Sequence, residues 1–282
     1  MKVMETNTAR VPSAADLQKI ALEIRKDIIR MTAAAGSGHP GGSLSAADIV
    51  TALYFCVMRH DPKSPKWPDR DRFILSKGHA SPVLYSALAR SGYFSVDQLI
   101  TFRKLGSPLQ GHPDMRRVPG VEASTGSLGQ GLSIGLGMAL ARKIQKKSYH
   151  TFVMMSDGEM NEGQTWEGAA FGAHHKLDHL VLVIDCNKFQ LSDATAKILN
   201  MDSLVAKWKS FNWDVQEIDG HDFGQILSSL EKAKQAAQKP AVIIAHTIKG
   251  KGVSFMENNN HFHGVAPTAE EAKKALEELN RG

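Results

Sequence analysis

Three carboxylates and two glycines stand close together in the segment VMMSDGEMNEG at residues 153–163, which begins as an apolar run. Its aspartate, Asp157, would follow a buried strand, and Asn187 follows a second apolar run thirty residues later. A carboxylate, an amide oxygen and a nearby backbone carbonyl are hard oxygen ligands that suit Mg²⁺, which also accepts phosphate oxygens. The two residues therefore predict a metal site for a phosphate-bearing ligand, with two ordinary turns as the alternative.

A glycine-rich segment, TGSLGQG at residues 125–131, precedes a helical pattern. Its glycines allow backbone N–H groups to face an anion at the positive end of that helix. The segment is neither a Walker motif, because no Gly-Lys-Ser/Thr follows it, nor a dinucleotide fingerprint after a clear strand. Gly131, Gly135 and Ala139 recur at helical spacing, so close helix packing is the alternative for these later positions.

Four of the twelve histidines share a local context, because each adjoins glycine or proline in a predicted loop or at a helix start. An imidazole near neutrality transfers protons and forms hydrogen bonds with hydroxyl groups, so together they predict a polar pocket for a hydroxyl-rich substrate. Their spacing is not that of a zinc site. These residues are His39, His79, His112 and His263. Surface or structurally satisfied positions are expected for His60, His150, His174, His175, His179 and His221.

The segment TIKGKG at residues 247–252 follows another predicted strand. Lys249 within it could reach an anion, and the flanking glycines permit close approach of the backbone. A solvated lysine in a flexible loop is the alternative.

Apolar strands alternate with amphipathic helices along the chain, which predicts an α/β fold with a mostly parallel sheet and helices on both faces. Ligands bind outside the carboxyl ends of such strands, so the polar loops should meet at one edge. Strands are predicted at residues 72–76, 150–155, 179–185, 213–218 and 241–247. Helices are predicted at residues 17–29, 43–58, 78–92, 95–104, 126–147, 165–175, 202–211, 223–238 and 268–280.

The chain has 282 residues and a formal net charge of +5 that is spread along its length. This charge suits an anionic small ligand and does not indicate a nucleic-acid partner. Two cysteines without metal-type spacing are typical of a reducing compartment. The first residues lack the apolar segment of a signal peptide, and residues 180–184 are too short an apolar run to span a bilayer. We therefore expect a cytoplasmic protein with no membrane partner.

Together these motifs resemble the N-terminal, diphosphate-binding half of transketolases over almost the whole chain. The matching segments, in the order of the family, are SGHPGG, SKGHAS, GHP, TGSLGQG, SDGEMNEG with DCNKF, TIKGKG and HGVAP. The resemblance implies the thiamine-diphosphate-binding fold and a single diphosphate-binding domain over residues 1–282. Ser156 departs from the broad signature, which usually has glycine there, and its small side chain should have little consequence.

The resemblance also implies roles for individual residues. Mg²⁺, or Ca²⁺ or Mn²⁺ in its place, would be held by Asp157, Asn187 and the backbone carbonyl of Phe189. The residues implied to contact thiamine diphosphate are His79, Gly126, Ser127, Leu128, Gly158, Glu162, Asn187, Lys249 and His263. The residues implied to face the sugar and assist its proton transfers are His39, His79, His112 and His263. Glu162 would also lie at the subunit boundary and form a hydrogen bond toward a glutamate of the partner, whereas Glu159 is expected to be only a solvated or helix-starting acid.

The implied reaction is transfer of a two-carbon ketol unit from a ketose phosphate to an aldose phosphate, as in the pentose phosphate pathway. The pyrimidine-binding and C-terminal domains of the family have no counterpart in this sequence. We therefore expect a second chain that carries them, an α2β2 heterotetramer, and an isolated chain that is essentially inactive. The alternatives are a split transketolase for an unusual sugar phosphate or sulfosugar, another thiamine-diphosphate enzyme, and a non-catalytic scaffold or regulatory homologue.

Overall fold

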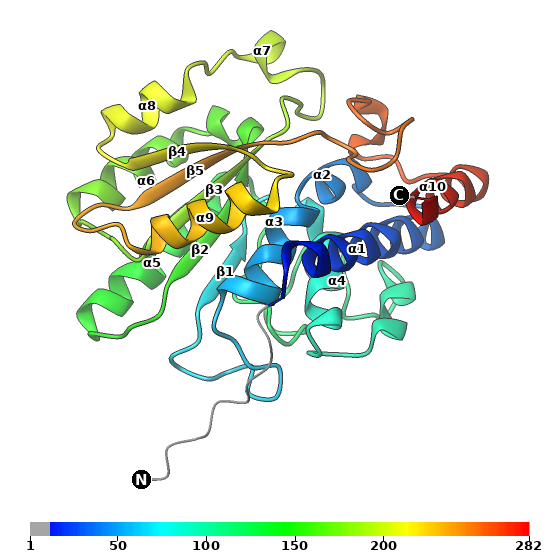
Figure 1. Cartoon of the computed structure of the whole chain (residues 1–282), viewed down its shortest axis with the longest axis horizontal. Helices are drawn as coiled ribbons and strands as arrows, with labels where there is room; N and C mark the ends of the chain where they lie inside the picture. Colours follow the sequence, from blue (N-terminus) through cyan, green and yellow to red (C-terminus); the bar gives the residue numbers. More distant parts are fainter. Residues whose placement is uncertain (1–11, 282) are drawn as a thin grey trace.

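Five strands form one sheet in which every neighbouring pair is parallel, in the order β1-β2-β3-β5-β4 (Figure 1). The computed structural model describes residues 12–281. β-Branched and other apolar residues fill the central strands, which suits strands that are covered on both faces. The strands are β1 (Arg72–Leu75), β2 (Thr151–Ser156), β3 (Leu180–Cys186), β4 (Asp214–Asp219) and β5 (Ala241–His246).

The register of the sheet aligns the carboxyl ends of the three central strands. Ser156 of β2 pairs with Asp185 of β3, and Cys186 of β3 pairs with His246 of β5. The loops that begin at residues 157, 187 and 247 therefore leave the sheet side by side. This arrangement confirms the predicted parallel α/β fold and brings the polar loops to one edge.

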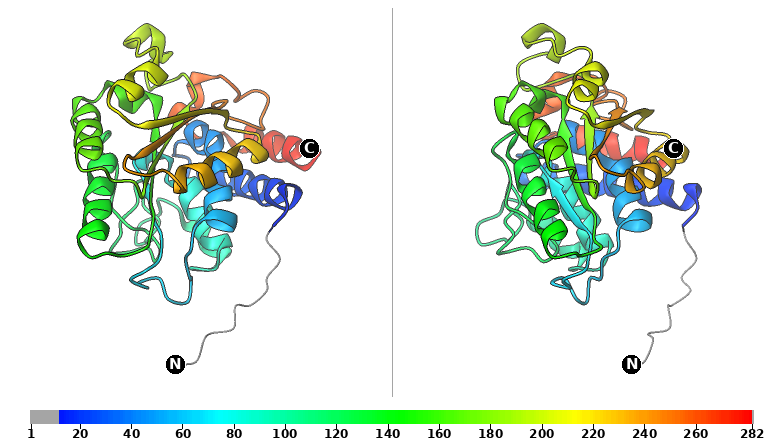
Figure 2. Two further views of the ribbon diagram at one scale, coloured as in Figure 1. Left: turned by 60° about the vertical axis from the view of Figure 1, so that its left-hand side comes forward. Right: turned by 90° about the vertical axis from the view of Figure 1, so that its left-hand side faces the viewer.

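Helices cover both faces of the sheet, as Figure 2 shows from two further directions. Alternate residues of each strand point to opposite faces, so Met154 belongs to one apolar cluster and Val153 to the other. The first cluster lies under α1 (Ala14–Ala35), α3 (Ala47–Ala52), α4 (Ser81–Arg90) and α9 (Phe223–Lys234). The second lies under α5 (Gln130–Ile144), α6 (Gly163–His174) and α8 (Leu204–Ser210).

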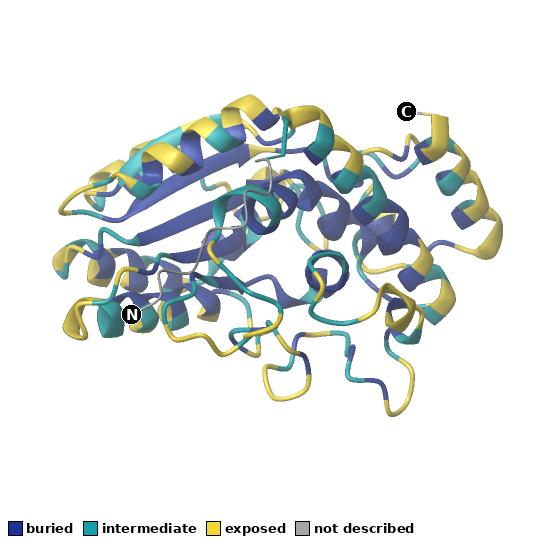
Figure 3. Ribbon diagram, turned by 60° about the horizontal axis from the view of Figure 1, so that its bottom comes forward, coloured by how far each residue is buried: buried dark blue, intermediate teal, exposed yellow. Residues whose placement is uncertain are grey.

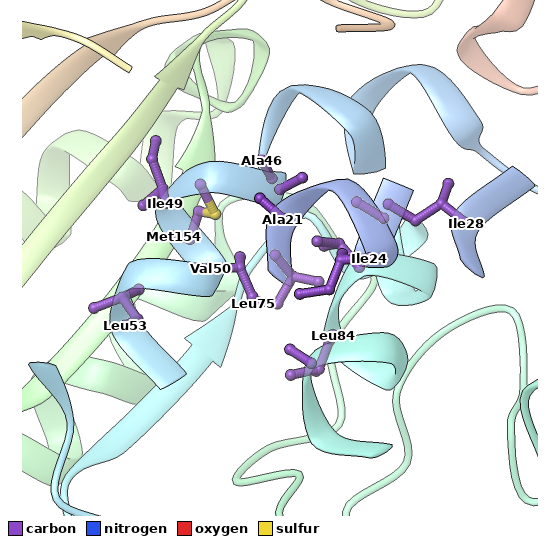
Figure 4. Packing of buried hydrophobic residues seen from close by; sticks show 14 of the residues in the cluster. Ala21, Ile24, Ile28, Ala46, Ile49, Val50, Leu53, Leu75, Leu84 and Met154 are labelled. Carbon is purple, nitrogen blue, oxygen red and sulfur yellow. The ribbon is translucent and has the colours of Figure 1, made fainter. Parts of the chain in front are cut away.

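The first cluster is the larger core. Figure 4 shows side chains of α1, such as Ile24, lying close to Val50 of α3, Leu84 of α4 and the strand residues Leu75 and Met154. Figure 3 shows that the central strands β2, β3 and β5 are buried while the outer faces of the helices are exposed. No helix within residues 12–281 is both long enough and apolar enough to cross a membrane.

The predicted helix at residues 43–58 is wrong in its start and its continuity. The helical region begins at Pro40, because proline fits the first position of a helix, where its missing N–H is not needed. It divides into α2 (Pro40–Ser45), α3 and a π-helical turn (Leu53–Val57).

Several further short elements were not predicted. They are the 3₁₀ turns Asp157–Asn161 and Asn260–His263 and the helix α7 (Thr195–Ile198), while the predicted helix at residues 78–92 begins with a 3₁₀ turn (Gly78–Ala80). The segment predicted as a short helix at residues 95–104 is a 3₁₀ helix (Val96–Thr101), and α10 (Ala269–Arg281) ends the described chain.

The glycine-rich segment is a turn followed by a closely packed helix. Gly126 and Gly129 have φ values of 144° and 78°, which delays the start of α5 to Gln130. A Cβ at Gly131 would lie 2.4 Å from the Cβ of Ser76, and one at Gly135 would lie 2.4 Å from Val153 Cγ2. Close packing of α5 on the sheet is therefore the role of these two later glycines.

Candidate functional site

A cavity of about 270 Å³ lies at the carboxyl edge of the sheet, among the loops that follow β1, β2, β3 and β5. The predicted site residues that line it are His39, His79, Gly126, Leu128, Gly158, Glu162, Asn187, Phe189, Lys249 and His263. Three other predicted residues lie just outside this lining. Ser127 is exposed on the turn, His112 lies behind Gly126, and Asp157 lies beneath the loop after β3.

Asp157 and Asn187 belong to loops that are bonded to each other. Asp157 Oδ2 accepts a 2.9 Å hydrogen bond from the backbone N–H of Lys188, and its Oδ1 accepts one of 3.1 Å from Gly158. Asn187 Oδ1 accepts a 3.2 Å hydrogen bond from the N–H of Phe189. Oxygen atoms of a carboxylate and an amide are thus held at adjacent strand ends, in loops joined by a direct hydrogen bond.

The electrostatics at Asp157 favour a bound cation. Burial raises the pKa of this carboxyl to about 7, and the nearby charge of Asp185 adds to the effect. A divalent ion would offset both the burial of the ionised carboxylate and its repulsion by Asp185. One carboxylate, one amide oxygen and one backbone carbonyl are ligands that suit Mg²⁺. Within residues 12–281 no group of three or more His, Cys, Asp or Glu side chains could hold a metal, so a site here would depend on neutral oxygens and on the ligand.

A buried ion pair, which the sequence alone did not reveal, supports Asn187. Lys77 Nζ donates to Asp185 Oδ2, and both side chains are almost fully buried. Burial opposes ionisation of Asp185, but the charge of Lys77 holds its pKa below the usual value. The same carboxylate accepts a 3.2 Å hydrogen bond from Asn187 Nδ2. Asp185 therefore engages the amide nitrogen of Asn187 and leaves the amide oxygen available as a metal ligand. Ser45 and Thr247 also donate to Asp185.

Glu159 is not the solvated acid that we expected, because its side chain is fully buried. Its Oε1 accepts hydrogen bonds from Ser76 Oγ at 2.5 Å and from the Gly129 N–H at 2.9 Å, and Oε2 accepts one of 2.8 Å from the Ser156 N–H. Burial raises the pKa of this carboxyl, and the three donors oppose the rise. The anion that faces the N–H of Gly129 is therefore Glu159 itself.

Lys249 is buried rather than solvated, with 1% of its surface exposed. Its Nζ donates to Asn260 Oδ1 at 2.9 Å and lies 2.6 Å from His263 Nδ1. Burial lowers the pKa of Lys249 to about 8, so the side chain is still cationic at neutral pH. An ammonium group beside the cavity could neutralise an anionic ligand, and anion binding by Lys249 stays a prediction.

Three of the four predicted histidines form one cluster at the cavity. The ring centroids of His39 and His79 are 5.1 Å apart, those of His79 and His263 are 5.4 Å apart, and those of His39 and His263 are 5.8 Å apart. Burial is the first cause that lowers the pKa of each of these imidazoles: to about 4 for His39, to about 3 for His263, and well below the ordinary value for His79. The cluster therefore presents neutral imidazoles at physiological pH.

The fourth histidine, His112, is exposed and lies against the glycine turn, where a Cβ at Gly126 would be 2.7 Å from its Cδ2. Two of the histidines that we expected to be structural are fully bonded. His60 contacts Tyr93 Oη and the Tyr54 carbonyl, and His221 contacts Asp48 and the N–H of Ile248. Glu162 lines the cavity, and its side chain has no hydrogen-bond partner within residues 12–281.

The fold and the site together define an α/β domain with a cavity, lined by imidazoles and two lysines, at the carboxyl edge of its sheet. The chain belongs to the transketolase family, because residues 17–280 match the family model described as "Transketolase, thiamine diphosphate binding domain". The resemblance to the N-terminal half of transketolases is thereby confirmed.

Relatives of similar length are named as subunits. The chain is 46% identical over 266 residues to the 6-deoxy-6-sulfo-D-fructose transketolase subunit of Clostridium sp. (strain MSTE9), a match that covers 94% of this chain and 97% of the relative. It is 43% identical over 256 residues to an apulose-4-phosphate transketolase subunit of Phocaeicola vulgatus, and this match covers 91% of each chain. The transketolase of Campylobacter jejuni superposes with a TM-score of 0.90 at 34% identity, over 95% of this chain and 43% of that one.

Proposed function

We propose that this chain is the diphosphate-binding subunit of a two-chain transketolase that depends on thiamine diphosphate and Mg²⁺. The observation that carries the proposal is the convergence of the imidazole cluster, Lys249 and Asn187 on one cavity, with Asp157 bonded to the loop of Asn187 just outside its lining. Relatives that align along nearly their full length are named as transketolase subunits, which supports a partner chain. The chain would form a single domain over residues 1–282, and the partner would supply the pyrimidine-binding domain in an α2β2 assembly.

Each part of the cavity has a role in this proposal. Thiamine diphosphate supplies the carbon nucleophile that transfer of a ketol unit needs. Asp157, Asn187 and the Phe189 carbonyl would hold Mg²⁺, and Lys249 would neutralise the diphosphate. Gly126, Ser127, Leu128 and Gly158 would allow the backbone to approach the diphosphate closely.

The imidazoles and Glu162 would serve the sugar and the partner. His39, His79, His112 and His263 would form hydrogen bonds with the sugar hydroxyls, and His79 and His263 would also contact the cofactor. Glu162 would face the partner chain, with its carboxylate unpaired until the two chains meet. Cytoplasmic localisation is part of the proposal and rests on the free cysteines Cys56 and Cys186.

A second candidate is a transketolase specialised for an unusual sugar. It is favoured by the printed names of the two relatives cited above, which specify a sulfosugar and apulose-4-phosphate instead of the sugars of the pentose phosphate pathway. The cavity contains no lysine or arginine besides Lys77 and Lys249 among its lining residues, so the groups that bind the far end of the sugar would come from the partner.

The test combines the purified chain with the protein that co-purifies with it. Ketol transfer should appear only with both chains, thiamine diphosphate and Mg²⁺, and it should disappear in the Asp157→Ala variant. Donors to compare are fructose 6-phosphate, 6-deoxy-6-sulfo-D-fructose and apulose-4-phosphate. Robust turnover by the chain alone would overturn the two-chain proposal. Failure of the pair to bind the cofactor or to act on any donor would favour a non-catalytic scaffold.

A further inference from the structure

Two of the clustered imidazoles are each bonded to a cation through the same ring nitrogen. Lys249 Nζ lies 2.6 Å from Nδ1 of His263, and Arg103 Nη2 lies 3.4 Å from Nδ1 of His39. Guanidinium and ammonium groups carry only donors, so the ring nitrogen that they contact must be an acceptor. Nδ1 is therefore unprotonated in both rings.

The other ring nitrogen must then carry the proton. A neutral imidazole has one N–H, and an occupied acceptor at Nδ1 leaves Nε2 as the donor. Neither Nε2 atom has a hydrogen-bond partner within residues 12–281. Neither is a buried polar atom left unsatisfied, because both remain accessible to solvent. Both rings line the cavity, so their Nε2–H groups are available to a ligand there.

The guanidinium of Arg103 is held in place on several sides. Its Nη1 donates to Ser37 Oγ at 2.5 Å, and it lies 5.4 Å from the ring centroid of Phe102. A Cβ at Gly111 would lie 2.8 Å from Nε and Nη2, so the backbone there packs directly against the group. No carboxylate within residues 12–281 forms an ion pair with Arg103. Nη2 of Arg103 therefore contacts the imidazole of His39 and not a carboxylate.

We infer that Arg103 and Lys249 are positioning residues that fix His39 and His263 as Nε2–H tautomers, so that both imidazoles act as hydrogen-bond donors in the cavity. Arg103 was not among the residues that the sequence singled out. A ring with its proton on Nε2 and a cation on Nδ1 has no free nitrogen with which to take a proton from a substrate. It can instead stabilise negative charge on a substrate oxygen.

The four histidines then fall into two pairs. The rings of His79 and His112 form no hydrogen bond within residues 12–281, so either of their nitrogens can accept or donate. Proton transfer during ketol transfer would then belong to His79 and His112, and oxygen binding to His39 and His263. This division of labour rests on the proposed function, whereas the tautomers themselves do not.

The tautomers can be observed directly in the full chain, without cofactor or partner, by ¹⁵N NMR of protein labelled at histidine. Signals are assigned with His39→Gln and His263→Gln. For both residues at pH 7 we expect a pyridine-type shift at Nδ1 and a pyrrole-type shift at Nε2. A pyrrole-type Nδ1 in either wild-type ring would overturn the inference for that ring, whatever the outcome of the activity assay.

Substitution identifies the cause. Arg103→Met should convert His39 to a mixture of tautomers and raise its pKa, because the nearby cation is removed while His112 and Lys249 stay in place. His263 should keep its Nε2–H form in this variant. Arg116→Met, at an exposed arginine thirteen residues further along the chain, is the control and should leave His39 unchanged. An Arg103→Met protein in which His39 retains a single Nε2–H tautomer would show that Arg103 does not fix it.

Discussion

At the scale of single residues, the buried carboxylate of Glu159 makes a specific prediction. Glu159→Ala leaves the Ser76 hydroxyl and the N–H groups of Gly129 and Ser156 without their acceptor in a buried region. We expect the free energy of unfolding to fall by about 2–4 kcal/mol, because each unsatisfied buried donor costs about 1–3 kcal/mol and some will find water. Glu159→Gln keeps one acceptor oxygen and should cost less. Urea denaturation measures both changes.

The matched control is Glu277→Ala on the exposed face of α10. This change should lie within about 0.5 kcal/mol of the wild type. If Glu159→Ala were as stable as this control, the three donors would not depend on the carboxylate, and its role in ordering the glycine turn would be refuted.

The same residue shows why part of the site could not be predicted from the sequence. Asp157 and Asn187 were recognisable because each follows an apolar run, and parallel strands bring such loops together. Glu159 looked like a solvated acid because nothing in its neighbourhood in sequence reveals Ser76 and Gly129, which are distant along the chain. Lys77 and Asp185 were missed for the same reason, since Lys77 follows β1 and Asp185 belongs to β3, and only the folded sheet brings the two together.

At the scale of elements, two glycine-to-alanine changes in helix α5 should alter the free energy of unfolding in opposite directions. Gly131→Ala places a Cβ 2.7 Å from the Cα of Ser76, so strand or helix must shift, and we expect a loss of about 1–3 kcal/mol. Gly137→Ala on the same helix meets nothing within 4 Å and should gain about 0.5–1 kcal/mol from helix propensity. Thermal and urea unfolding of the two variants measure these changes. Equal effects would contradict the close packing of α5 on the sheet.

Element types were predictable along most of the chain, and element boundaries were less so. The strands were recognisable because apolar runs bounded by polar loops are a strong signal. The predicted helix at residues 43–58 was wrong at its start because Pro40 was not included in it, although its ring suits a first helical turn. The turns at residues 157–161 and 260–263 gave no periodic pattern, because they are shorter than the window of roughly 11–18 residues over which a period can be recognised.

At the scale of the whole molecule, half-buried histidines lie at both ends of the strands. The imidazole cluster lies at the carboxyl edge, while His150 lies just before β2 at the amino edge. The ring of His150 stacks on that of His179 with centroids 4.7 Å apart, and its Nδ1 is buried without a hydrogen-bond partner. Any acid sensitivity that arises at His150 is therefore separate from the site.

His150 should make the fold sensitive to acid. Burial lowers the pKa of His150 to about 4, although Asp71 opposes the shift and His179 adds to it. The unfolded chain, with an ordinary pKa near 6.5, binds the proton first, so stability is complete above about pH 6.5 and declines toward pH 4. His150→Phe keeps a flat ring and removes this titration.

Other groups also titrate, and Asp157 with its raised pKa acts in the opposite direction. The measurement is therefore the difference between wild type and variant in urea unfolding from pH 7.5 to 4.5: the variant should lose less stability on acidification, and parallel profiles would show that His150 is not held neutral by the fold.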